Sequence, residues 1–521
     1  MRMIAAVLGA LLALTSSSSV RADELQVNVA SGALSGLASR DGLVRSFKGI
    51  PYAAPPVGAL RWRPPQPVAA WQGTREANRF SPICVQPSPI PGSFYQREFF
   101  QIAEAQSEDC LYLNVWTAAP PGAEPRPVMV FFHSGGNAIW SGSMAVYDGS
   151  HLARKGAVVV TLNFRLGAFG FLTHPELDAE SPNHVSGNYG LLDQQAALRW
   201  VKANIAAFGG DPERITIFGQ SAGASDVGYA MASPLAKGLF RRAIIESSAI
   251  FGTAGPTPKL ASVEEGGKKL VTELGAPSIA ALRDMTAAQI VALVGRKFTA
   301  YGLQPAIDGW VLPRSLPEAI ATGQQNGTEL LVGSTANEGI QLMPPTTPEA
   351  LRTTVKQWFG TQAEPIAALY TGTDPDTATV AQDQLQSDYV AAQARVTAAL
   401  LTRQGHPAWV YSFNRAAPGS DPAKVGAFHC AELVYVFGTQ NTVDRPWAEL
   451  DRQLSDVMSS YWVRFAATGN PNGPALPEWP AYDEQSRHIR EFGSRINGGP
   501  GAKAAPLFEA YLSSRLSPMK E

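Results

Sequence analysis

Several signals that would place this chain in other protein classes are missing. There is no Cys-x-x-Cys pair and no His-Glu-x-x-His motif, so the sequence supports neither structural zinc nor zincin chemistry, and no metal or organic cofactor is expected. The 42 basic and 44 acidic residues leave a net charge of −2 with no Lys/Arg-rich run, which argues against a nucleic-acid partner. The 40 prolines and 48 glycines follow no period, which excludes a collagen-like chain. A hydrophobic content of 45% over 521 residues is instead typical of a large globular protein.

Long hydrophobic runs are also scarce. The run Ile4–Leu14 follows Arg2 and precedes a small-residue cleavage site at Val20-Arg21-Ala22. A run of about 11 residues is too short to span a bilayer, so residues 1–22 are predicted to be a secretory signal peptide. No second apolar stretch is long enough to span, and the C-terminal residues are too polar for a lipid-anchor signal. We therefore expect a secreted or periplasmic protein without stable membrane insertion.

The three cysteines fit that compartment. Cys84 and Cys110 lie in a Pro/Ser-rich segment, whereas Cys430 is distant in sequence. A disulfide between the first two would close a short loop, and three free thiols are the alternative that the spacing alone leaves open.

Short β-rich runs alternate with helical stretches through most of the chain. The runs are 128–132, 157–163, 214–218, 243–246, 329–332 and 408–413. This alternation predicts an α/β fold with a mostly parallel central sheet flanked by helices, and the alternating pattern of 25–50 predicts antiparallel strands before it. Residues 257–300 and 347–403 are predicted to be helical insertions that cover a cleft. With no convincing linker, residues 23–521 are expected to form one catalytic domain.

The strongest local motif is Gly219-Gln220-Ser221-Ala222-Gly223, which directly follows the predicted strand 214–218 and precedes a predicted helix. A sharp turn in this context presents the Ser221 hydroxyl above the sheet, and the glycines avoid side-chain collisions within the turn. The helix that begins there also offers backbone N–H groups to a developing oxyanion. Ser221 is therefore the candidate nucleophile.

A serine nucleophile needs a general base, and in α/β-hydrolases the order along the chain is serine, acid, histidine. Only His406, His429 and His488 follow Ser221. His406 precedes Pro407 in a predicted turn, and His488 lies in a predicted charged surface strand. His429 sits in a small-residue loop that leaves room for a protruding imidazole, so it is the favoured base.

For the acid, Glu338 lies in a loop directly after the strand 329–332, at the carboxyl end of a strand where open α/β sheets place their chemistry. Asp308 competes, but Asp308-Gly309 is more typical of a turn. The oxyanion hole is expected from the glycine-rich turn Ser134-Gly135-Gly136-Asn137, which follows the strand 128–132. No phosphate-binding Gly-x-x-x-x-Gly-Lys-Ser/Thr motif accompanies that turn.

With these residues in place, the chain resembles the type-B carboxylesterase family over nearly all of residues 23–521. The motifs that carry the resemblance are Phe47-Lys48-Gly49-Ile50-Pro51-Tyr52-Ala53, Ser107-Glu108-Asp109-Cys110-Leu111, Asn163-Phe164-Arg165-Leu166-Gly167, Gly333-Ser334-Thr335-Ala336-Asn337-Glu338-Gly339 and Gly426-Ala427-Phe428-His429. The resemblance implies an α/β-hydrolase fold with helical insertions over an active-site gorge.

The resemblance also implies roles for individual residues. Ser221 is the nucleophile, Glu338 the acid and His429 the base of a catalytic triad. The further implied groups are an oxyanion hole from the N–H groups of Gly135, Gly136 and Ala222, a Cys84–Cys110 disulfide, an unpaired Cys430, and structural ion pairs between Arg61 and Glu108 and between Arg165 and Asp193.

Four positions depart from the family pattern or stay undecided. Ser134 stands where the first glycine of the oxyanion loop is usual, and Asn137 replaces a common aromatic residue, which predicts a more polar pocket floor. Gln220 replaces the common glutamate before the nucleophile, which weakens the case for choline esters. The sequence leaves open whether Asp226 faces the histidine or solvent.

The predicted activity is hydrolysis of a small-molecule carboxylic ester by water through an acyl-enzyme, without a cofactor. The alternatives are a specialised esterase for a bulky or multiply charged ester, a lipase, or a non-enzymatic binding module, which the complete triad disfavours. The sequence names neither the acyl nor the alcohol group, nor the oligomeric state.

Overall fold

The computed structural model describes residues 25–99, 104–120, 122–248, 250–252, 257–327, 329–422, 424–493, 496–500 and 505–516. The predicted signal peptide, residues 1–22, lies outside these residues. Within the described part of the chain, no helix has both the length and the apolar character needed to cross a membrane.

An 11-stranded sheet forms the centre of the molecule, in the order β16-β15-β14-β13-β12-β11-β9-β10-β8-β4-β3. The strands from β10 to β15 along this order pair in parallel, and antiparallel strands complete both edges. Their bounds are β3 (Leu37–Ala38), β4 (Arg45–Pro51), β8 (Tyr112–Thr117), β9 (Arg126–Phe132), β10 (Val158–Leu162), β11 (Gly210–Gln220), β12 (Arg242–Glu246), β13 (Glu329–Thr335), β14 (Ala408–Phe413), β15 (His488–Phe492) and β16 (Ile496–Pro500). The predicted mostly parallel sheet is confirmed.

The N-terminal strands are antiparallel, as predicted. Strand β1 (Gln26–Val29) pairs with β2 (Gly32–Ser35), and β3 pairs with β4. The proline-rich segment that follows, residues 51–91, contains the short strands β5 (Thr74–Glu76) and β6 (Ile83–Cys84). Strand β6 pairs with β7 (Gln106–Ser107).

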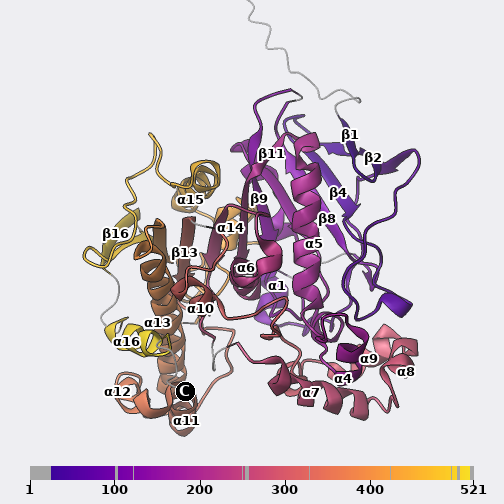
Figure 1. Ribbon diagram of the computed structural model, residues 1–521. Coiled ribbons are helices and arrows are strands. Elements are labelled where there is room, and N and C mark those ends of the chain that lie inside the picture. The colour runs from indigo at the N-terminus through magenta and orange to yellow at the C-terminus, as the bar shows by residue number, and fades with distance from the viewer. Residues whose placement is uncertain are drawn as a thin grey trace, which may run out of the picture.

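Helices cover both faces of the sheet (Figure 1). Along β9, Val128, Val130 and Phe132 belong to the core beneath α5 (Tyr189–Asn204), α6 (Ala222–Ala232) and α13 (Pro375–Thr402). The alternate residues Met129 and Phe131 belong to a second core beneath α2 (Ser150–Arg154), α14 (Leu433–Val436) and α15 (Glu449–Thr468). Burial on both faces explains why this strand is apolar at consecutive positions.

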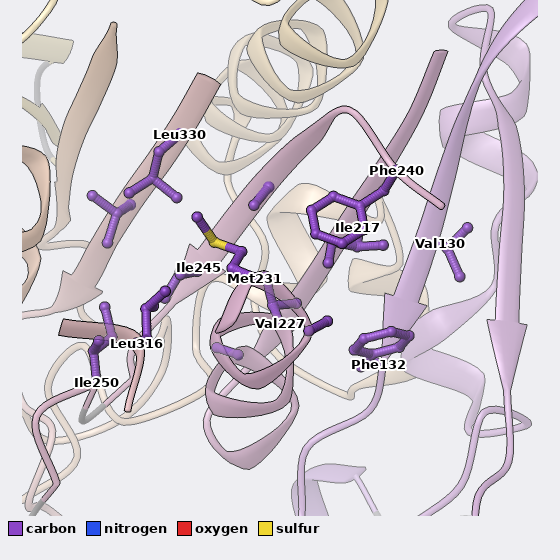
Figure 2. Packing of buried hydrophobic residues seen from close by; sticks show 14 of the residues in the cluster. Val130, Phe132, Ile217, Val227, Met231, Phe240, Ile245, Ile250, Leu316 and Leu330 are labelled. Atoms are coloured by element: carbon purple, nitrogen blue, oxygen red, sulfur yellow. The ribbon is translucent and has the colours of Figure 1, made fainter. Parts of the chain in front are cut away.

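Helix α6 is packed directly on the sheet. Figure 2 shows its Val227 and Met231 among strand residues such as Ile217 and Ile245, all in one core. In the segment before α6, Leu191, Leu198, Val201, Ile205 and Phe208 recur at the spacing of a helix's apolar stripe, and all five are buried. These contacts fix α6, and therefore the turn before it, relative to the central strands.

The two insertions are helical, as predicted. The first contains α7 (Leu260–Glu273), α8 (Ile279–Asp284) and α9 (Ala287–Val294), gathered at one end of the molecule (Figure 1). The second contains α11 (Pro348–Phe359), α12 (Ala363–Ala367) and α13, whose start is capped by Asp374. The remaining helices are α1 (Phe94–Phe99), α3 (Gly167–Phe171), α4 (Pro175–Glu180), α10 (Leu316–Ala321) and α16 (Ala505–Ser514).

Candidate active site

Ser221 occupies a strained turn between strand β11 and helix α6. Its backbone angles are φ 58° and ψ −124°, and a positive φ is unfavourable for a residue with a side chain. Its N–H donates to the carbonyl of Glu246 on the adjacent strand at 2.9 Å, which holds the turn against the sheet. The half-buried side chain lies on the wall of a cavity, as the turn motif predicts.

Both glycines of the turn are required by close packing. A Cβ on Gly219 would lie 2.5 Å from the backbone of Gly223, and a Cβ on Gly223 would lie 2.1 Å from the carbonyl oxygen of Phe132. The start of α6 therefore approaches the end of β9 closely, and the loop that follows β9 lies beside the turn.

His429 and Glu338 are brought together from loops after β14 and β13. The Nδ1 atom of His429 is hydrogen-bonded to Oε2 of Glu338, and both side chains are buried. The other oxygen of Glu338 accepts a hydrogen bond from the N–H of Thr335 at 2.8 Å. This arrangement leaves Nε2 as the ring nitrogen that does not contact Glu338.

Two opposed effects act on the pKa of His429. Burial lowers it, but the charge of Glu338 and the hydrogen bond to it outweigh burial, so the pKa lies above the ordinary value of 6.5. Glu338 therefore stabilises the imidazolium that forms when the ring accepts a proton.

Gln220 contacts the base directly. Its Nε2 lies 3.3 Å from Nε2 of His429. Its Oε1 accepts hydrogen bonds from Ser134 Oγ at 2.6 Å and from Cys430 Sγ at 3.0 Å. Two of the departures from the family pattern, Ser134 and Gln220, thus form one interaction beside the base.

Helix α13 supports the loop that carries Glu338. Asp383 accepts hydrogen bonds from the N–H groups of Gly339 and Ile340 at 2.8 and 2.9 Å, and Ser387 Oγ accepts one from the N–H of Glu338 at 2.9 Å. No sequence pattern reveals either residue, because an aspartate and a serine in an insertion form no recognisable motif.

Asn337 links the acid loop to the base loop. Its Nδ2 donates to Asp383 Oδ2 at 3.0 Å, and its Oδ1 accepts from the N–H of Ala427, two residues before His429, at 3.0 Å. The relative position of acid and base therefore depends on α13 as well as on the sheet.

The glycine-rich turn after β9 lies beside Ser221. Gly135 has φ 106° and Gly136 has φ 67°, and a Cβ on Gly135 would lie 2.1 Å from the carbonyl oxygen of Ile139, so glycine is required there. No described residue accepts a hydrogen bond from the N–H of Gly135, Gly136 or Ala222. These donors are the three that the family resemblance implies for the oxyanion hole; Ala222 is among the residues that line the cavity, whereas Gly135 and Gly136 are not.

The prediction that Asn137 makes the pocket floor more polar is wrong. Asn137 is buried and does not line the cavity, because its Nδ2 instead donates to Asp226 Oδ1 at 2.9 Å. Asp226 is also completely buried and so does not face solvent, and its two carboxylate oxygens accept hydrogen bonds from Asn137 and Gln194 and not from His429.

The cavity above Ser221 has a volume of about 440 Å³. Besides Ser221, Glu338 and His429, its described polar lining residues carry only hydroxyl and amide groups: Ser225, Tyr229, Ser247, Thr257, Thr299, Gln304 and Gln386. Among them, Thr257 and Thr299 come from the first predicted insertion and Gln386 from the second, as expected. No described lining residue is a lysine or arginine.

Two further carboxyl groups, which no sequence pattern reveals, are buried in this region of the protein. Glu246 accepts a hydrogen bond from Trp462 Nε1 at 2.5 Å, and Glu432 accepts one from Ser247 Oγ at 3.1 Å. Burial raises the pKa of each to about 8, with a further increase at Glu432 from the nearby charge of Glu246.

The other candidate residues lie apart from this site. Asp308 accepts hydrogen bonds from the N–H groups of Trp310 and Leu312, as a turn residue does. His406 precedes β14, outside the cavity lining, and His488 begins β15, which is flanked by β14 and β16 and so is not an edge strand.

The covalent and ionic links follow the family expectation. Cys84 and Cys110 form a disulfide, and Cys430 is a buried free thiol. Arg61 pairs with Glu108 at 2.5 Å, and Arg165 pairs with Asp193 at 2.7 Å. Both members of the Arg165–Asp193 pair are buried, as expected for a structural ion pair.

The fold and the site define a serine ester hydrolase of the α/β-hydrolase class, and the carboxylesterase family model matches residues 23–499. The chain belongs to the carboxylesterase family and is a carboxylesterase.

Several relatives align over most of the chain. It is 38% identical to the fumonisin B1 esterase of Sphingopyxis macrogoltabida, over 91% of this chain and 88% of that protein. It is 37% identical to the para-nitrobenzyl esterase of Bacillus subtilis (strain 168), over 87% and 92% of the two chains. A solved PNB esterase structure has a TM-score of 0.79 at 33% identity and covers 94% of this chain and 100% of its own, and a thermophilic PNB esterase has a TM-score of 0.81 at 34% identity with the same coverage.

Proposed function

We propose that Ser221 is the nucleophile of this carboxylesterase, that His429 is its general base and that Glu338 orients the base. The observation that carries the proposal is the buried hydrogen bond between His429 and Glu338 on the same cavity as Ser221. Nucleophile, base and orienting acid are the three groups that serine hydrolysis needs.

In the first step, His429 Nε2 removes the hydroxyl proton as Ser221 Oγ attacks the ester carbonyl. The carbonyl oxygen becomes an oxyanion, which the N–H groups of Gly135, Gly136 and Ala222 stabilise. The tetrahedral intermediate collapses, the C–O bond to the alcohol breaks, and His429 returns the proton to the leaving alcohol. The product of this step is an acyl group on Ser221.

In the second step, water replaces the alcohol. His429 removes a proton from the water as it attacks the acyl carbonyl, and the same N–H groups stabilise the second oxyanion. Collapse releases the carboxylic acid and returns the proton to Ser221. Glu338 remains ionised throughout and stabilises the imidazolium form of His429.

The cavity favours a neutral ester that carries polar oxygen groups. Its hydroxyl and amide side chains can exchange hydrogen bonds with such groups, whereas no described lysine or arginine is present to neutralise carboxylates of the substrate. The described lining therefore supports neither a multiply anionic ester nor an all-apolar pocket for the long acyl chain of a lipase substrate.

We further propose that residues 1–22 act as a signal peptide and that residues 23–521 form one catalytic domain, which functions outside the cytoplasm. The Cys84–Cys110 disulfide supports this, because disulfides persist mainly in oxidising compartments.

The first test is replacement of the nucleophile. Ser221→Ala should reduce ester turnover by about a million-fold without unfolding the protein. A fluorophosphonate probe should label Ser221 in the wild type, and peptide mass spectrometry should find no label in the variant. His429→Ala should be comparably inactive, whereas the control variants His406→Ala and His488→Ala should retain activity. Turnover by Ser221→Ala at the wild-type rate would refute the assignment.

A further inference from the structure

Asp226 is a buried carboxylate that the proposed mechanism does not use. It lies on α6, in the second turn after the nucleophile, and is 0% exposed. Its Oδ1 accepts the hydrogen bond from Asn137 Nδ2 at 2.9 Å, and its Oδ2 accepts one from Gln194 Nε2 at 2.6 Å. The carboxylate therefore connects three segments: helix α6, the loop after β9 and helix α5.

A carboxylate in this place is costly. Burial raises the pKa of Asp226 to about 7, although the hydrogen bonds from Asn137 and Gln194 lower it. An apolar side chain of similar size would fill the same space without a desolvation cost. The carboxylate is better explained by what it holds than by the stability of the core.

The carboxylate of Asp226 holds Asn137, the residue next to the predicted oxyanion donors. Asn137 directly follows Gly136 and has φ 56°, a conformation that asparagine adopts more readily than most residues. Its carbonyl accepts a hydrogen bond from the N–H of Gly167 at 2.7 Å, so the residue is fixed on two sides. Its Oδ1 has no hydrogen-bond partner among the described residues, which leaves the contact with Asp226 as the side chain's anchor.

We infer that Asp226 is a positioning residue for the oxyanion hole. Through Asn137 it sets the loop that carries the N–H groups of Gly135 and Gly136 against the helix that carries the N–H of Ala222. All three donors must converge within hydrogen-bond distance of one oxygen atom, so a small displacement of the loop weakens stabilisation of the transition state. This inference rests on the proposed function, since it gives those N–H groups their role.

The test begins with Asp226→Ala, which removes both hydrogen-bond acceptors and leaves the sequence of the oxyanion loop unchanged. We expect kcat to fall about tenfold to a hundredfold with little change in KM, because the lost interaction acts in the transition state. Inhibition by a trifluoromethyl ketone should weaken by the same factor. In that complex Ser221 Oγ adds to the ketone carbonyl, its proton passes to His429, and the ketone oxygen becomes an oxyanion in the hole.

Two conservative single variants and their combination test the hydrogen bonds themselves. Asp226→Asn keeps one acceptor oxygen for Asn137 but turns its amide nitrogen toward the donor of Gln194, so it should lose less activity than Asp226→Ala. Asn137→Asp places two carboxylates opposite each other and should lose activity. The double variant Asn137→Asp/Asp226→Asn reverses the donor and acceptor, while the amide oxygen introduced at position 226 still accepts from Gln194, so it should be more active than Asn137→Asp alone.

Met231→Ala is the matched control, since Met231 is buried on the same helix but contacts the hydrophobic core (Figure 2). It should lower Tm and leave kcat and the ketone inhibition constant unchanged. The inference would be overturned if Asp226→Ala lowered Tm but left kcat and the ketone inhibition constant unchanged, as Met231→Ala should. It would also be overturned if the double variant were no more active than Asn137→Asp. The second comparison can be made even if Asp226→Ala does not fold. Failure of the proposed function is distinguishable, because the fluorophosphonate probe would then not label Ser221 in the wild type.

Discussion

At the scale of single residues, the pKa of His429, the proposed base, should set the pH range in which the enzyme works. Its pKa is raised by Glu338 in spite of burial, and only the neutral ring accepts the proton of Ser221. We therefore expect kcat/KM to rise with pH and to level off above a pKa higher than 6.5. Because Gln220 Nε2 lies 3.3 Å from Nε2 of His429, a charge introduced at position 220 should alter the pKa of His429 strongly.

Gln220→Glu tests this directly. A carboxylate at this position could accept hydrogen bonds from Ser134 Oγ and Cys430 Sγ, and its charge would stabilise the imidazolium form of His429. The acid limb of the kcat/KM profile should move to higher pH by about one unit. The control Gln304→Glu adds the same charge on the cavity wall without a hydrogen bond to His429, so its shift should be smaller. Superimposable profiles for Gln220→Glu and wild type would contradict the geometry described above.

Between elements, strand β12 and the residue before helix α14 each contribute a carboxyl group that stays protonated at neutral pH. Glu246 and Glu432 have pKa values of about 8, against an ordinary value of 4.5. The folded protein holds these protons up to about pH 8, while the unfolded chain releases them near pH 4.5. The free energy of unfolding should therefore fall as the pH rises between these values, because the unfolded chain binds fewer protons than the folded protein.

Glu246→Gln cannot ionise, and its amide oxygen can still accept the hydrogen bond from Trp462. The Tm of this variant should be close to wild type near about pH 5 and higher than wild type near about pH 8. Thermal unfolding at both pH values measures the difference. A Tm difference that is the same at both would show that Glu246 does not retain its proton on folding.

At the same scale, sequence patterns predicted the elements better than the contacts between them. The β-rich runs identified strands because burial on both faces makes consecutive residues apolar, and the 191–208 stripe identified a helix because burial of one face imposes a helical period. Asp383 and Ser387 could not be found in this way, since their role depends on which loop α13 meets. The wrong prediction for Asn137 has the same origin: its position in the motif was clear, but the buried acceptor on α6 was not.

At the scale of the whole molecule, several distant parts of the chain build the proposed substrate-binding cavity. The turn at Ser221, both insertions and the loops after β13 and β14 all contribute lining residues. We predict that kcat/KM is higher for a neutral ester with hydroxyl or ether groups than for a dianionic ester of the same size. Gln304→Lys, which adds a cation to the wall, should shift the preference toward the anionic ester. Equal hydrolysis of both esters by the wild type would contradict the proposed substrate class.

The order of the strands has a consequence for how this protein becomes active. Ser221 follows β11, Glu338 follows β13 and His429 follows β14. In the sheet these strands lie close together, in the order β11-β12-β13-β14, although the helical insertions separate them along the chain. Such long-range parallel pairing is slow, because distant segments must meet before any contact rewards them. No fragment that ends before β14 contains a complete site. Recovery of esterase activity during refolding therefore reports the assembly of the central sheet itself, at a stage that helix content measured by circular dichroism would not distinguish.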